Sequence, residues 1–127
     1  MKLLVRFHDK GTNPIIAKAV IDTGVLINVE RAVINSSEGE ALVDVPDTEC
    51  HIVSDALRSL GAEVRIIDSG VQRDTYRCVS CGACISICPK EVFSFDDEWL
   101  VITNEKKCIL CGRCVLACPH QALSISY

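Results

Sequence analysis

Eight cysteines in two runs of identical spacing constrain the second half of this 127-residue chain more than any other feature. Each run is followed directly by a proline, and the second begins thirty residues after the first: Cys78, Cys81, Cys84 and Cys88, then Cys108, Cys111, Cys114 and Cys118. The match extends beyond the cysteines, because residues 77–95 can be laid on residues 107–125 with Gly82 over Gly112. This internal duplication predicts two halves related by a pseudo-twofold axis.

The spacing within each run suits an iron–sulfur cube. Three thiolates on one tight loop can reach three of the four irons, and the fourth thiolate must come from another direction. Two runs of C-x2-C-x2-C-x3-C-P are the pattern of two [4Fe–4S] clusters, in which the fourth cysteine of each run ligates the other cluster. We therefore expect two ligand sets: Cys78, Cys81, Cys84 and Cys118 for cluster I, and Cys108, Cys111, Cys114 and Cys88 for cluster II.

A disulfide framework and two structural zinc sites are the alternative interpretations of eight cysteines. Disulfides require an oxidising compartment, and the apolar stretch after Met1 is far shorter than the hydrophobic region of a signal peptide. Zinc sites come as two separated pairs of ligands, often with a histidine. Three cysteines within seven residues fit an iron–sulfur cluster better than they fit a disulfide framework or a zinc site.

Charge and hydropathy limit the kinds of partner that the chain is expected to bind. The formal net charge is −4, and the thiolates around two oxidised cluster cores add about −2 per cluster. An acidic chain without a basic stripe is not expected to bind nucleic acid, and it favours a partner with a positive docking patch. No apolar stretch approaches the roughly 20 residues of a membrane span. Oxygen destroys exposed clusters, so we expect a reducing cytoplasm.

The first seventy residues predict an α+β domain of a second kind. Expected strands cover residues 3–8, 25–34, 41–45 and 63–68, with helices after Pro14 and after Pro46. The order βαββαβ is that of the ferredoxin-like sandwich, in which two helices cover one face of four antiparallel strands. We therefore expect a sandwich domain over residues 1–70, a linker over 69–75, and the cluster domain over 71–127.

Helix boundaries and core positions follow from local signals. Asn13 is expected to cap the first helix with Pro14 as its first residue, and Gly24 to end it. Asp47 or Thr48 is expected to cap the second helix. That helix should bury four apolar side chains before it stops at Gly61: Val53, Ala56, Leu57 and Leu60.

No catalytic constellation is visible in the first seventy residues. His8 and His51 have no metal-ligand neighbours and are expected to be solvated. Cys50 fits a small buried hydrophobic residue, and alternatively a reactive thiol near a helix N-terminus that carries a persulfide. His120 follows Cys118-Pro119 and is expected at the surface near cluster I, where a hydrogen bond could adjust the potential.

The first half resembles the NIL domain, a small regulatory domain of methionine-importer ATPase subunits. The matching segments are residues 13–16, 24–29, 39–43 and 57–64, and Glu30 departs from the motif at a position where NIL domains have leucine. A NIL domain followed by a two-cluster ferredoxin resembles an archaeal family, the iron–sulfur subunits of L-aspartate semialdehyde sulfurtransferase.

This resemblance implies an electron-transfer subunit for a catalytic partner that forms homocysteine for methionine biosynthesis, with an unknown electron donor. It also implies that the NIL-like half docks to the partner or senses an amino acid such as methionine. Three alternatives remain: a general low-potential ferredoxin, an amino-acid-responsive redox sensor, and a sulfur carrier acting through Cys50. A homodimer through an exposed sheet edge is also compatible with the sequence.

Overall fold

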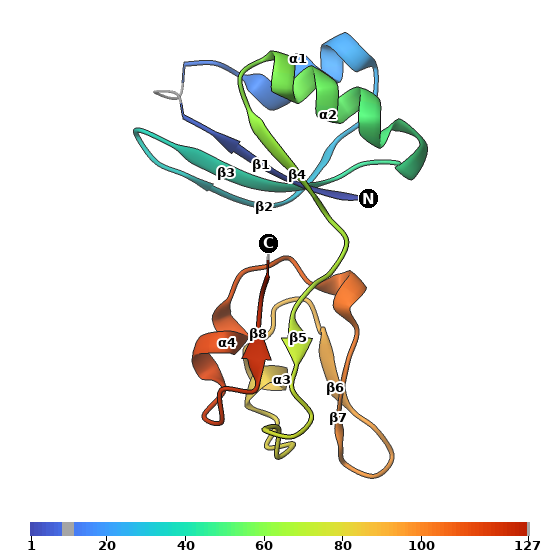
Figure 1. Cartoon of the computed structure of the whole chain (residues 1–127), viewed down its shortest axis with the longest axis vertical. Helices are drawn as coiled ribbons and strands as arrows, with labels where there is room; N and C mark the ends of the chain where they lie inside the picture. Colours follow the sequence, from blue (N-terminus) through green and yellow to red (C-terminus); the bar gives the residue numbers. More distant parts are fainter. Residues whose placement is uncertain (9–11, 127) are drawn as a thin grey trace. The chain divides into compact units, whose positions relative to one another are not determined.

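The structure is a computed structural model that describes residues 1–8 and 12–126. The chain forms two compact units, Met1–Asp68 and Ser69–Tyr127 (Figure 1). Both units mix helices and strands. None of the described helices is both long and apolar enough to cross a bilayer.

The first unit is a four-stranded antiparallel sheet with both longer helices on one face (Figure 1). Its strands stand in the order β2-β3-β1-β4. The elements along the chain are β1 Lys2–Phe7, α1 Ile15–Thr23, β2 Asn28–Ile34, β3 Gly39–Asp44, a 3-10 turn at Asp47–Glu49, α2 Cys50–Ser59 and β4 Glu63–Ile67.

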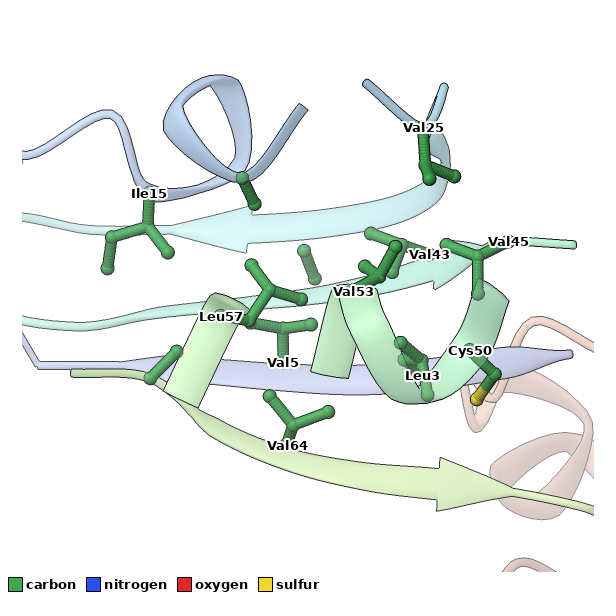
Figure 2. Packing of buried hydrophobic residues seen from close by; sticks show 13 residues of the cluster. Leu3, Val5, Ile15, Val25, Val43, Val45, Cys50, Val53, Leu57 and Val64 are labelled. Carbon is green, nitrogen blue, oxygen red and sulfur yellow. The ribbon is translucent and has the colours of Figure 1, made fainter. Parts of the chain in front are cut away.

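Alternation along the strands builds the core between sheet and helices. Leu3 lies opposite Val43, and Val5 lies opposite both Ala41 and Val64. Figure 2 shows Leu3, Val5, Val43 and Val64 in one cluster with Val53 and Leu57 of α2. Ala56 and Leu60 pack against this core but are only partly buried. All four predicted positions of α2 therefore contribute to the core, and two of them, Ala56 and Leu60, lie at its margin.

The opposite face of the sheet also buries side chains. Leu4 and Leu42 are opposite each other in register and are 2% and 0% exposed. On the same face Glu40 accepts hydrogen bonds from Arg6 and Arg31, both at 2.8 Å. This two-arginine pairing ties three neighbouring strands together.

Two predicted helix caps are wrong. Pro14 itself occupies the N-cap of α1, and no side chain caps the helix; the Asn13 Oδ1 accepts from Lys18 Nζ instead. The N-cap of α2 is Glu49, again without a side-chain cap. The Asp47 carboxylate accepts from the Met1 amino group at 2.7 Å, a charged donor that outcompetes a backbone amide.

The second strand begins later than predicted. Gly24 ends α1 in the left-handed conformation as expected (φ 71°), but Thr23 Oγ1 then accepts from the Val25 amide. This bond holds Val25 at the helix end, and β2 starts only at Asn28. At the following hairpin Asn35 Oδ1 accepts from the amides of Ser37 and Glu38, both at 2.9 Å.

The second unit consists of short elements in two similar halves. They are β5 Gln72–Arg73, α3 Ala83–Ile87, β6 Phe93–Phe95, β7 Val101–Thr103, a 3-10 turn at Glu105–Lys107, α4 Arg113–Ala117 and β8 Leu123–Ser124. Two two-stranded antiparallel sheets form, β5 with β8 and β6 with β7. The predicted linker is wrong over much of its length, since Val71 is 1% exposed and β5 is a paired strand.

Candidate metal centre

The two cysteine runs fold in the same way, as the duplication predicted. In the first run Ser80 (φ 56°) and Gly82 (φ 80°) turn the backbone left-handed between Cys78 and Cys84. Leu110 (φ 57°) and Gly112 (φ 75°) do the same in the second run. These turns wrap each run into a loop that ends in a five-residue helix, α3 or α4.

Each helix stops just before the last cysteine of its run. Cys88 and Cys118 are C-caps in extended conformation (ψ 118° and 113°), as the proline that follows each of them requires. Both helices thus end at the residue before the fourth cysteine of the run. The extended backbone instead leads each fourth cysteine out of its own loop.

Strand pairing explains why the fourth cysteine of each run lies beside the other run. The strand that follows Cys88, β6, pairs with β7, which precedes Cys108. The strand that follows Cys118, β8, pairs with β5, which precedes Cys78. Each sheet therefore draws the end of one run to the beginning of the other.

Two pockets result, each lined by four cysteines. The first is lined by Cys78, Cys81, Cys84 and Cys118, and the second by Cys88, Cys108, Cys111 and Cys114. These groupings coincide with the two expected ligand sets, while the bonds to iron stay a prediction. Within residues 1–8 and 12–126 no three His, Cys, Asp or Glu side chains are grouped to hold a single metal ion.

Backbone amides point at four of the cysteine sulfurs in two symmetry-related pairs. The amides of Ser80 and Leu110 donate to Cys78 Sγ and Cys108 Sγ, each at 3.4 Å. The amides of Val92 and Ala122 donate to Cys88 and Cys118 in the same way, again at 3.4 Å. Such donors stabilise thiolate charge, which is the form in which cysteine binds iron.

The thiols of each pocket differ in acidity. Burial raises the pKa of Cys84, and it raises the pKa of Cys114 to about 11, with the charges of Cys108 and Cys111 adding to the effect at Cys114. Burial acts in the same direction on Cys78, but the Ser80 amide and the Arg73 guanidinium outweigh it and lower the pKa. Loading of the buried thiols therefore requires metal to displace their protons.

Arg73 makes the two pockets unequal. It lines the first pocket, and its repeat-equivalent position thirty residues later is Thr103. The Nε of Arg73 is buried and has no hydrogen-bond partner among the described residues, although the guanidinium lies close enough to Cys78 to lower the pKa of that thiol. The sequence analysis did not identify this residue. Two signals were visible: Arg73 stands five residues before Cys78, and the equivalent residue of the second repeat, Thr103, is uncharged.

The remaining candidate residues lie where the sequence indicated. His120 is exposed and lines the first pocket beside Cys118. His8 and His51 are exposed in the first unit. Cys50 is 3% exposed and belongs to the hydrophobic core (Figure 2), which agrees with the small buried hydrophobic residue and leaves its thiol little access to solvent.

Comparisons with known proteins show which proteins this chain is similar to. Residues 77–123 match the model of the 4Fe-4S dicluster domain. A protein of Methanosarcina acetivorans named L-aspartate semialdehyde sulfurtransferase iron-sulfur subunit is 48% identical over 87 residues, 68% of this chain and 67% of that protein. A Methanocaldococcus jannaschii protein of the same name is 32% identical over 95 residues, 73% of this chain and 72% of that protein. No solved structure matches significantly.

The duplicated cysteine loops and the matching domain define the class first: this is an iron–sulfur protein of the dicluster type. The two relatives then define the family. The chain belongs to the L-aspartate semialdehyde sulfurtransferase iron–sulfur subunits.

Proposed function

We propose that this chain carries two [4Fe–4S] clusters and supplies electrons to a catalytic subunit that converts L-aspartate semialdehyde and sulfide into homocysteine. The observation that carries the proposal is the pair of four-cysteine pockets, each lined by three thiols of one run and one of the other. When bound, each cluster supplies reversible one-electron transfer at a potential set by its surroundings.

The residues of the first pocket fit a cluster rather than a bare cavity. The buried Nε of Arg73 lacks an acceptor among the described residues, and the sulfides of a cluster are acceptors of the right kind. The amides that donate to Cys78 and Cys118 hold negative charge on the ligands. Buried donors of this type raise the potential of a nearby cluster.

The stoichiometry agrees with two one-electron carriers. Conversion of an aldehyde and hydrogen sulfide into a thiol releases one water and consumes two electrons and two protons. A protein that holds two electrons at once can complete this reduction in a single encounter. The chain itself offers binding and electron transfer, and the catalytic residues would belong to the partner.

The first unit has a supporting role in this proposal. Its element order and strand order match those of the ferredoxin-like sandwich, and with the motifs at residues 13–16, 24–29, 39–43 and 57–64 they support a NIL-like domain over residues 1–70. We assign this domain to docking or to sensing of an amino acid. Calorimetry with methionine up to millimolar concentration tests the sensing role, and the absence of heat would remove it.

The decisive assay combines the anaerobically reconstituted, reduced protein with the catalytic subunit, aspartate semialdehyde and sulfide. Homocysteine should form only when this chain is present with both clusters. A Cys81→Ala variant, which removes one ligand of cluster I, should lower the yield per protein. Homocysteine formation at an equal rate with cluster-free protein would overturn the proposal and favour a general ferredoxin with another acceptor.

A further inference from the structure

The hairpin between β6 and β7 displays the sole tryptophan of the chain in an unfavourable backbone conformation. Trp99 has φ 61° and is 73% exposed. Left-handed backbone is costly for a bulky side chain, and glycine or asparagine would occupy this turn position at lower cost. Backbone strain combined with an exposed indole ring points to function at this position.

The cluster framework does not require this strain. Five described residues other than glycine have positive φ, and four of them form two pairs separated by thirty residues. Those pairs are Ser80 with Leu110 and Glu91 with Gln121. Trp99 has no counterpart in the other half of the duplication. It belongs to the hairpin alone.

The turn is held rigidly. Asp96 Oδ1 accepts from the amides of Glu98 and Leu100, both at 2.9 Å. The Asp96 amide donates to the Leu100 carbonyl at 2.9 Å, and the Trp99 amide donates to the Asp96 carbonyl at 3.1 Å. A preorganised turn presents the indole ring without a further loss of backbone entropy on binding.

An aromatic pair joins this turn to the loop of the first pocket. The rings of Phe95 and Trp99 meet edge to face with centroids 5.6 Å apart. A Cβ on Gly82 would lie 2.8 Å from Cζ of Phe95, so the Phe95 ring covers this glycine. Gly82 lies directly after Cys81 in the run and lines the pocket with it. The hairpin is therefore packed on the loop of cluster I.

The surface of the hairpin combines apolar and acidic groups. We use the term hairpin tip for residues 95–100. Phe95 and Leu100 are 37% and 51% exposed beside Trp99, and Asp96, Asp97 and Glu98 are consecutive. Tryptophan is enriched among the residues that dominate binding energy at protein interfaces. The adjacent carboxylates call for basic groups on the opposing surface.

We propose that the hairpin tip docks this chain to its catalytic subunit, with Trp99 in an apolar recess bordered by lysine or arginine side chains. This inference rests on the proposed electron-transfer function. An aromatic anchor suits a lasting subunit interface, whereas transient electron-transfer encounters bury small areas. Docking at the hairpin tip brings the catalytic subunit against the loop of cluster I.

The test compares anaerobic affinities of the cluster-loaded protein for the catalytic subunit. Trp99→Asn relieves the backbone strain and removes the ring, and it should weaken binding at least tenfold, equivalent to about 1.4 kcal/mol. Leu116→Asn is the matched control, since Leu116 is 91% exposed on α4, and it should bind as the unmodified protein does. Asp97→Asn combined with Glu98→Gln should slow association at low salt.

A spectroscopic signal from Trp99 itself tests the contact without relying on a variant that fails to fold. Incorporation of 5-fluorotryptophan gives one fluorine resonance from Trp99, which should shift when the catalytic subunit is added. An unshifted resonance, or equal affinities of the unmodified and Trp99→Asn proteins, would overturn the docking proposal while leaving the electron-transfer function intact. Failure of the unmodified protein to bind or support the catalytic subunit would contradict both. Slower reduction by an electron donor, with unchanged subunit affinity, would overturn the inference in favour of a donor site.

Discussion

The two units of this chain are stabilised by different means. The first contains helices of nine and ten residues and a core cluster of thirteen buried residues. The second has helices of five residues and strands of two or three residues. Three of its buried apolar positions are cysteines that line the two pockets: Cys84, Cys108 and Cys114. Side-chain burial holds the first unit, and bonds to iron would hold the second.

This difference matters for function as well as stability. A unit of about sixty residues buries little of its unfolded surface, and metal binding commonly supplies the missing free energy. In the second unit the same thiolates would secure the fold and hold the redox centres. The first unit is then free to serve docking or sensing without depending on the redox centres for its fold.

The largest expected effect is the selective unfolding of the second unit when the clusters are removed. Chelation under anaerobic conditions should collapse the dispersed amide resonances of residues 69–126, because their remaining core is too small. Resonances of residues 1–8 and 12–68 should stay dispersed. Two-dimensional NMR spectra of the loaded and cluster-free protein provide the measurement. A well-dispersed second unit in the cluster-free protein would remove the contrast between the units.

The second-largest expected effect is a loss of stability that is confined to the first unit. Leu57 is fully buried in the first core, so Leu57→Ala should lower the free energy of unfolding of that unit by about 2–5 kcal/mol. Denaturant titration of the loaded protein, followed through first-unit resonances, measures the change. Ile52→Ala on the same helix is the control, since Ile52 is 56% exposed and should cost only about 0.5 kcal/mol. Cluster absorbance should be unchanged in both variants at low denaturant.

The smallest expected effect is a loss of stability of the first unit at acidic pH. Partial burial alone would raise the pKa of Glu40, but the hydrogen bonds and charges of Arg31 and Arg6 outweigh it, and the pKa lies below its usual 4.5. A lowered folded-state pKa contributes stability that is present above the unfolded value and is lost as pH falls through the folded value. The first unit should therefore lose about 1 kcal/mol from this group on acidification below pH 4.5.

Glu40→Gln provides the control for the acid effect. The variant should be less stable than the unmodified protein at neutral pH, and the difference should shrink as pH falls. Urea titrations at several pH values, read from first-unit resonances, separate this from acid loss of the clusters. A constant difference across the range would show that the ionised carboxylate contributes nothing specific.

Features that depend on spacing and periodicity were largely predictable from the sequence. The repeated cysteine spacing indicated which cysteines share a pocket, and helical spacing placed Val53 and Leu57 in the core. Prediction failed where a long-range or charged partner overrides a local signal. Asp47 accepts from the Met1 amino group rather than capping α2, and residues 72–73 pair with β8 rather than forming a linker.

The remaining features could not be read from local patterns. The buried Nε of Arg73 and the packing of Phe95 on Gly82 depend on how distant segments meet. The left-handed conformation of Trp99 goes against its residue preference. Such departures from local preference are expected at functional sites.

The interlocked ligand sets are the central claim, and four alanine variants test it directly. Cys81→Ala and Cys111→Ala remove expected ligands of cluster I and cluster II, and this assignment is the same whichever cluster the fourth cysteine of each run binds. Electron paramagnetic resonance of each reduced variant should then show one surviving signal. We predict that Cys88→Ala, although altered in the first run, reproduces the spectrum of Cys111→Ala, and that Cys118→Ala reproduces that of Cys81→Ala. If Cys88→Ala instead matched Cys81→Ala, each run would hold its own cluster, and the interlocked arrangement of the second unit would be wrong.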